Sequence, residues 1–129
     1  MSGDKVIFVD TNVVVGFLNR DMFIVDLLNR YSSLCGLLYV SVIVEIEAMS
    51  FSKLSDDEVH FLKKFFKSNF HQVNLDPNIA DITARFRRES KIKLPDALIA
   101  ATAMSMNAPL LTRNIKDFKK VLGLKIISI

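Results

Sequence analysis

Short apolar runs alternate with longer segments of helical periodicity along this chain. Apolar, β-branched runs at residues 6–9, 37–40 and 110–111 predict buried strands. Residues 73–75 are a short strand candidate, and residues 126–129 predict a last strand. The segments between these runs predict helices, which span residues 13–19, 21–31, 41–49, 55–69, 76–90 and 95–106, with a short last helix after Asn114.

Polar residues mark the starts of several of these helices. Ser41 suits an N-cap, and residues 55–58 (Ser-Asp-Asp-Glu) form a capping box. Asp76 precedes Pro77, and Pro95 opens an alanine-rich segment, because proline is favoured in the first helical turn. These signals support the helix boundaries given by the periodicity.

Strands that alternate with helices predict an α/β fold. At 129 residues the chain is long enough for one domain, and we expect a single domain over residues 1–129. The predicted architecture is a parallel β-sheet with helices on both faces. In such sheets ligands bind beyond the carboxyl ends of the strands, and this edge is where chemistry is expected.

Composition narrows the class of protein. The longest uncharged apolar stretch, residues 34–44, is much shorter than the ~20 residues that span a membrane. The N-terminus lacks the apolar core of a secretory signal. The one cysteine, Cys35, excludes an internal disulfide and fits a reducing, cytoplasmic setting, while two distant histidines argue against a structural zinc site.

The charge is unevenly distributed. Residues 1–84 hold seven basic and eleven acidic residues, whereas residues 85–129 hold ten basic and only three acidic ones. A basic face of this kind is typical of proteins that bind polyanions. The basic residues form two clusters, at residues 85–93 and 113–125. A solvated helix face is the better explanation of one cluster alone, whereas two clusters leave the two interpretations evenly balanced. Phe86 and Phe118, inside the basic clusters, are candidates for stacking on bases.

Four acids follow predicted strands or begin helices close to them, namely Asp10, Glu47, Asp96 and Asp117. Each has a structural alternative, because Asp10 could cap a helix, Asp96 could complement a helix dipole and Asp117 could be a surface acid. Glu47 is the most informative. Glu45 and Glu47 are ~200° apart on a helix, so one reaches solvent while the other points inward.

Clustered carboxylates without histidine or cysteine favour a hard cation such as Mg²⁺ or Mn²⁺. Such a site activates water and neutralises the charge of a phosphodiester. The chain has no glycine-rich phosphate-binding loop and no Gly-x-Ser-x-Gly motif, so nucleotide-binding and serine-hydrolase chemistry is unsupported. Acids at the strand ends and a basic flank together favour a metal-dependent nuclease.

Four motifs in this chain resemble those of PIN-domain nucleases, and more closely those of VapC toxins from VapBC toxin–antitoxin systems. They are residues 9–13 (Val-Asp-Thr-Asn-Val), 41–47 (Ser-Val-Ile-Val-Glu-Ile-Glu), 94–103 (Leu-Pro-Asp-Ala-Leu-Ile-Ala-Ala-Thr-Ala) and 111–118 (Leu-Thr-Arg-Asn-Ile-Lys-Asp-Phe). The resemblance covers essentially the whole chain. In the second motif the acid lies six residues after the serine, which selects Glu47 over Glu45.

The resemblance implies a Mg²⁺- or Mn²⁺-dependent endoribonuclease with metal ligands at Asp10, Glu47 and Asp96. Asp117 or Asn114 would complete the site, and its charge favours Asp117. Asn12, Thr112 and Asn114 would orient the carboxylates. A homodimer and a small antitoxin partner are also implied.

The predicted RNA contacts are Arg85, Arg87, Arg88, Lys91 and Arg113.

Three alternatives remain open on the sequence alone. One is a housekeeping PIN-type nuclease that processes RNA, and another is a non-enzymatic RNA-binding module with a degenerate site. The third is a phosphatase of the haloacid dehalogenase type, whose chemistry needs a second aspartate where this chain has Asn12. Retention of all the core acids counts against the degenerate module.

Overall fold

The computed structural model describes residues 5–129, which form a five-stranded parallel sheet in the order β3-β2-β1-β4-β5. The strands are β1 (Phe8–Val9), β2 (Leu38–Ser41), β3 (Phe70–Val73), β4 (Leu110–Thr112) and β5 (Ile126–Ser128). The helices are α1 (Thr11–Leu18), α2 (Met22–Cys35), α3 (Val42–Ala48), α4 (Asp56–Asn69), α5 (Pro77–Glu89), α6 (Leu94–Ser105) and α7 (Ile115–Phe118).

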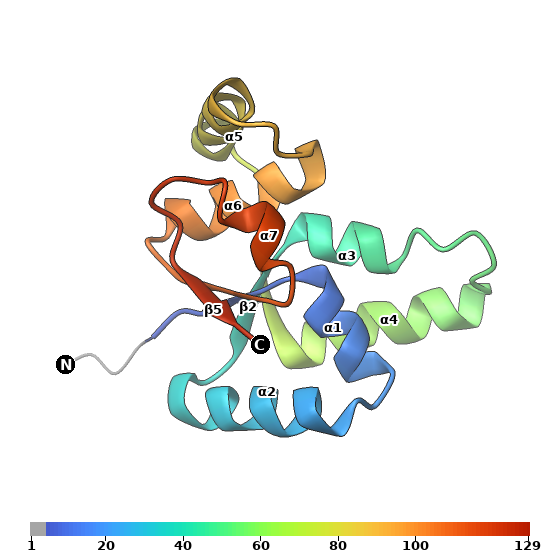
Figure 1. Ribbon diagram of the computed structural model, residues 1–129. Coiled ribbons are helices and arrows are strands. Elements are labelled where there is room, and N and C mark those ends of the chain that lie inside the picture. Colours follow the sequence, from blue (N-terminus) through green and yellow to red (C-terminus); the bar gives the residue numbers. More distant parts are fainter. Residues whose placement is uncertain (1–4) are drawn as a thin grey trace.

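This strand order places the helices in two layers. The chain steps from β1 through β2 to β3 in one direction and then from β4 to β5 in the other. Since parallel crossovers are right-handed, α1–α4 cover one face and α5–α7 the other. Figure 1 shows α5 and α6 above the strands and α2 below them. The predicted α/β fold, a parallel sheet with helices on both faces, is confirmed.

The core lies around the central strands. Phe8, Val9, Leu110 and Leu111 are fully buried, and the alanine-rich helix α6 packs against β2. The small side chains of residues 100–103 are also fully buried. Small side chains allow a helix to pack closely against its neighbours, and the buried residues of α6 supply them where it contacts β2.

Most helix starts agree with the sequence prediction. Ser55 and Glu58 form the expected capping box, and Asp76 caps α5 with Pro77 in its first turn. Helix α1 begins at Thr11, two residues earlier than predicted, because the side chain of Asp10 accepts a hydrogen bond from the Thr11 amide. Helix α2 continues past Tyr31 to Cys35. Gly36, which caps its end, has a positive φ of 83°, a conformation that glycine adopts readily.

Two predictions were wrong. The third strand spans Phe70–Val73 rather than residues 73–75, because it pairs with all four residues of β2 from Leu38 to Ser41. The ring centroids of Phe70 and Phe66 lie 5.9 Å apart, so the first residue of this strand also packs against α4. Phe86 and Phe118 are both buried in the core, so neither ring is available for stacking on bases.

Within residues 5–129 the structure has no helix with the length and apolar character needed to cross a membrane.

Candidate active site

Asp10 lies directly after β1 and is almost completely buried, with 4% of its surface exposed. The Thr11 amide donates a hydrogen bond to Oδ1 (2.8 Å), and the Thr112 hydroxyl donates one to Oδ2 (2.7 Å). Burial raises the pKa of Asp10 above its ordinary value, while these two hydrogen bonds lower it. Asp10 is therefore both a helix cap and a desolvated acid.

Glu47 approaches Asp10 from α3. Its Oε1 accepts a hydrogen bond of 2.6 Å from the hydroxyl of Thr11, the residue next to Asp10. Glu45 lies on a different side of the helix, in a hollow that also contains Lys63 and His71. The expected difference in direction is therefore seen, and Glu47 is the glutamate on the Asp10 side.

Glu45 is half-buried and keeps part of its surface exposed, as Glu47 does. Burial raises the pKa of Glu45, while the charge of Lys63 lowers it. Helix α4 packs over this side of the sheet, which a helical wheel of α3 alone cannot show.

The pKa of Asp96 is affected by the other three acids of the site. Its pKa is raised to about 6, first by burial and then by the negative charges of Asp10, Asp117 and Glu47. Lys93, at the start of the same helix, lowers it. Because each of the other three carboxylates acts on Asp96, the structure brings the four sequence-predicted acids together at the carboxyl edge of the sheet.

Asp117 is held by the residue that caps α7. The Asn114 side-chain amide donates a hydrogen bond to its Oδ2 (3.0 Å), and Lys120 lies 3.6 Å from its Oδ1. Both partners lower the pKa of Asp117, with the Asn114 hydrogen bond the larger cause. The Asn114 backbone amide in turn donates to Thr112 Oγ1 (2.9 Å), so this loop connects Asp117 with the hydroxyl that contacts Asp10.

Asn12 was expected to orient a carboxylate, but its side chain contacts the backbone of the loop after β4. Its Oδ1 accepts a hydrogen bond of 3.4 Å from the Arg113 amide. Asn12 therefore joins the start of α1 to the loop after β4, whereas Thr112 and Asn114 are the residues that contact carboxylates.

The donor set fits a hard divalent cation. In residues 5–129 no three His, Cys, Asp or Glu side chains converge closely enough to ligate an ion as they are placed. The available donors are nonetheless carboxylate oxygens, which Mg²⁺ and Mn²⁺ prefer. Burial, and after it the negative charge of the neighbouring acids, raises the pKa of Asp96, and a cation among the carboxylates would offset both effects.

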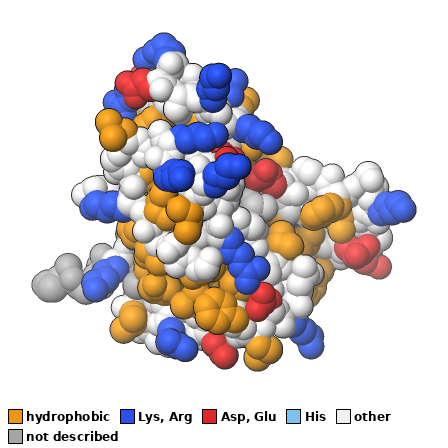
Figure 2. All heavy atoms as spheres, in the orientation of Figure 1, with side chains coloured by type: hydrophobic (Ala, Val, Ile, Leu, Met, Phe, Trp, Pro, Cys, Tyr) orange, Lys and Arg blue, Asp and Glu red, His pale blue; other side chains and the backbone are white. Residues whose placement is uncertain are grey.

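The predicted RNA contacts differ in what they already bind. Arg113 pairs with Asp21 at 2.8 Å, Arg87 donates to the Ile92 carbonyl (2.8 Å), and Arg85 lies 4.0 Å from Glu89. Arg88 and Lys91 are exposed and form no ion pair within the described part of the chain. Figure 2 shows Lys and Arg side chains gathered over the region of α5, α6 and α7.

Sequence reasoning missed three residues of this site. Thr11 contacts two of the acids, while Lys93 and Lys120 act electrostatically on Asp96 or Asp117. Both lysines belong to the basic clusters seen in the sequence, and each stands three residues from the acid that it affects, a spacing at which side chains on a helix are neighbours. Thr11 stands next to Asp10, and that adjacency was the available signal.

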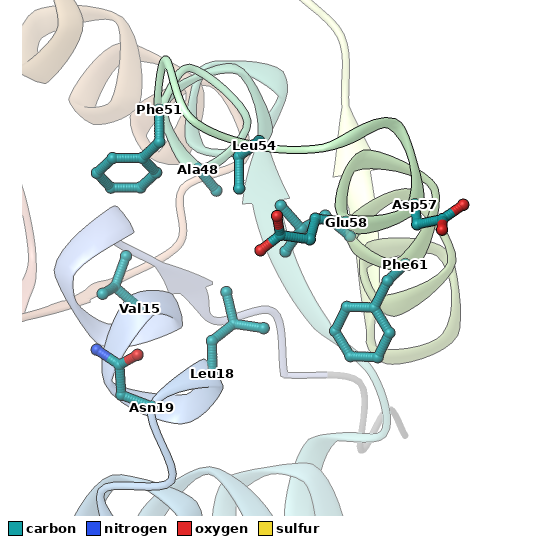
Figure 3. Close-up of a pocket in the computed structure, with 10 residues that line it drawn as sticks. Val15, Leu18, Asn19, Ala48, Phe51, Leu54, Asp57, Glu58 and Phe61 are labelled. Atoms are coloured by element: carbon teal, nitrogen blue, oxygen red, sulfur yellow. The ribbon is translucent and has the colours of Figure 1, made fainter.

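A separate apolar groove lies between α1 and α4. Figure 3 shows Val15 and Leu18 of α1 across from Phe51, Leu54 and Phe61. The cavity has a volume of about 470 Å³, and its other lining residues are Asn19, Ala48, Asp57, Glu58 and Leu62. A second hollow of about 450 Å³ shares Leu18 and Phe61 and extends along α2 to Met22 and Val25. None of the four acids lines either hollow.

Comparison with known proteins gives a family match and several similar folds. The PIN domain family matches residues 7–123. No curated protein matches the chain. The VapBC2 complex of Rickettsia felis, bound to a DNA fragment from its promoter, contains a chain of similar fold, with 22% identity, a TM-score of 0.80 and coverage of 96% of this chain and 98% of that one.

Two further solved structures are similar. A toxin–antitoxin complex from Klebsiella pneumoniae has a chain with 28% identity and a TM-score of 0.77, over 94% of this chain and 95% of that one. VapBC-1 from nontypeable Haemophilus influenzae gives 21% identity and a TM-score of 0.80, with coverage of 95% and 97%. The resemblance to VapC-like PIN domains is confirmed, and this chain belongs to the PIN-domain family.

Proposed function

We propose that this chain is a metal-dependent endoribonuclease and the toxin of a toxin–antitoxin pair. The observation that carries the proposal is the series of hydrogen bonds that joins Glu47, Asp10 and Asp117 at one edge of a PIN fold. Asp96 lies near enough for the charges of these three acids to raise its pKa, after the larger effect of burial. The solved complexes of similar fold support the toxin assignment.

In the proposed reaction Asp10, Glu47, Asp96 and Asp117 hold Mg²⁺ or Mn²⁺ through carboxylate oxygens. The bound ion supplies positive charge against the phosphodiester and lowers the pKa of water. Asp96 or Asp117 accepts the proton of the attacking water. Water attacks phosphorus in line and the 3′-oxygen leaves, so 5′-phosphate ends are expected.

Thr112 and Asn114 orient Asp10 and Asp117 in this proposal. Both make the hydrogen bonds to carboxylates that such a role needs. Asn114 presents its amide nitrogen to Asp117, which favours Asp117 over Asn114 as the fourth ligand. The basic residues near the end of α5 hold the RNA backbone.

The alternatives make different predictions. A housekeeping nuclease would cleave RNA without an antitoxin, whereas a non-enzymatic module would bind RNA without cleaving it. All four acids are present in this chain, and hydrogen bonds through Thr11, Thr112 and Asn114 join three of them, which favours an enzyme over a degenerate site.

We also propose that the apolar groove between α1 and α4 receives the antitoxin. Phe51 and Phe61 are 63% and 62% exposed at its walls, which is unusual for phenylalanine without a partner. An apolar helix face fits a groove of this kind. The homodimer implied by the sequence motifs also remains a proposal.

The first prediction compares Glu47→Gln with Glu45→Gln. Glu47→Gln removes a charge beside Asp10, so RNA cleavage and the affinity for Mg²⁺ should fall together, whereas Glu45→Gln should cleave close to normally. The measurement is single-turnover cleavage of single-stranded RNA against Mg²⁺ concentration. If the unaltered chain still cleaves RNA in excess EDTA, the metal mechanism is wrong. If Glu45→Gln is inactive and Glu47→Gln is active, Glu45 and not Glu47 belongs to the site.

The second prediction concerns stability without metal. The pKa of Asp96 is about 6 in the folded chain, against an ordinary value of 3.8, so the folded state binds more protons than the unfolded state between these values. Stability in chelator should therefore fall as the pH rises from about 4 to about 6. Asp96→Asn should raise the free energy of unfolding at pH 7.5 by about 1–2 kcal/mol, after allowance for solvent screening.

Thermal and urea unfolding in EDTA at pH 4 and pH 7.5 measure this effect, which should vanish at pH 4. Asp26→Asn, on an exposed part of α2, is the matched control and should leave stability unchanged. Equal stability of Asp96→Asn and the unaltered chain at pH 7.5 would contradict the proposed repulsion.

The third prediction concerns RNA affinity. The double variant Arg88→Ala/Lys91→Ala should weaken binding and flatten the salt dependence of log K by about 0.7 for each phosphate that is no longer neutralised. Arg87 is left intact because it donates to the Ile92 carbonyl. Lys64→Ala/Lys67→Ala removes the same charge from exposed positions on α4 and should keep the original slope. If the slopes of log K against salt concentration are equal for the two double variants, Arg88 and Lys91 do not contact the RNA.

The fourth prediction concerns the groove. When the chain is co-expressed with a candidate antitoxin, taken from any short open reading frame found beside its gene, a stable complex should form. Phe61→Asp should abolish that complex, because a charge would be buried against apolar walls. Phe23→Asp is the matched control, since Phe23 is 61% exposed but lies outside the groove. Loss of the complex in both variants, or in neither, would contradict this docking site.

A further inference from the structure

Thr11 contacts two acids of the candidate active site at once. Its backbone amide donates to Asp10 Oδ1 (2.8 Å), and its hydroxyl donates to Glu47 Oε1 (2.6 Å). Thr11 is the first residue of α1, so the cap that Asp10 provides also fixes the position of its hydroxyl. A single residue thus joins the acid after β1 to the acid on α3.

Glu47 is the acid that most needs such a contact. A glutamate has a longer and more freely rotating side chain than an aspartate, and ordering it costs more conformational entropy. Asp10 is fixed by the strand that it follows and by two hydrogen bonds. For Glu47, which lies near the end of the seven-residue helix α3, the hydroxyl of Thr11 restricts one carboxylate oxygen.

The contact also completes a continuous series of hydrogen bonds. Thr11 links Glu47 to Asp10, Thr112 links Asp10 to the Asn114 amide, and the Asn114 side chain reaches Asp117. Three of the four acids are therefore held in one network, with a hydroxyl or amide donor to each. Without Thr11 the network would no longer include Glu47.

We propose that Thr11 is a positioning residue that orients the Glu47 carboxylate toward Asp10 for cation binding. This inference rests on the metal site proposed above. Removal of an outer hydrogen bond of this kind weakens metal affinity by about 10–100-fold in other sites. Thr11 would act through Glu47 and would not itself touch the ion or the RNA.

The test measures Mn²⁺ binding by titration calorimetry and by electron paramagnetic resonance of free Mn²⁺, without RNA. Thr11→Val keeps the shape of the side chain and removes the hydroxyl, so the Kd for Mn²⁺ should rise by about 10–100-fold. Thr11→Ser restores a hydroxyl and should bind nearly as well as the unaltered chain. Thr83→Val makes the same chemical change at a buried site in α5 and should leave the Kd unchanged.

A purely structural role for Thr11 would give a different pattern. Thr11→Val would then lower the melting temperature, as Thr83→Val should, with no change in the Kd of the folded protein. If Thr11→Val does not fold, Thr11→Ser and Thr11→Ala replace it, because these two variants lack the same methyl group and differ only in the hydroxyl. Equal Mn²⁺ affinity within that pair would overturn the proposal.

Asp96→Asn separates failure of this inference from failure of the proposed function. If the unaltered chain binds Mn²⁺, Asp96→Asn does not, and Thr11→Val binds normally, the metal site stands and the role of Thr11 is rejected. If the unaltered chain does not bind Mn²⁺, or Asp96→Asn binds equally well, both the proposed metal chemistry and the role of Thr11 are rejected.

Discussion

The repulsion among carboxylates at one edge of the sheet is the constraint on which the site depends. Burial and the charges of three other acids raise the pKa of Asp96. Asp10, one of these acids, is almost fully buried. Such groups destabilise a folded chain unless each receives hydrogen bonds or a cation. The hydroxyls of Thr11 and Thr112 and the amide of Asn114 supply the hydrogen bonds, while the basic residues Lys93 and Lys120 reduce the net charge nearby.

The register of the sheet creates the most distant of these contacts. Val9 of β1 pairs with Leu111 of β4, so the next residues, Asp10 and Thr112, lie side by side although 102 positions separate them in sequence. The Asp10 amide also donates to the Leu111 carbonyl (3.0 Å). A shift of one residue between these strands would turn Thr112 to the other face of the sheet and remove its contact with Asp10.

Local sequence signals were sufficient for much of this arrangement. The position of Asp10 directly after an apolar strand indicated a helix cap or a desolvated acid, and Asp10 is both. The choice of Glu47 over Glu45 came from the resemblance to the second PIN motif. What failed depended on tertiary packing. The register of β3 is set by β2, and the burial of Phe86 requires knowing that α5 packs against α6. Likewise, Arg113 is one of several basic residues in the sequence, and only the fold shows that it forms an ion pair with Asp21.

Helix α1 connects the two regions to which function is assigned. Its first residue, Thr11, contacts Asp10 and Glu47, and four and seven residues later Val15 and Leu18 form a wall of the apolar groove. The helix spans eight residues, so its first residue and the wall of the groove lie within about two turns of each other. The proposed docking groove and the acids at the carboxyl edge of the sheet therefore share one short helix, although no acid lines the groove.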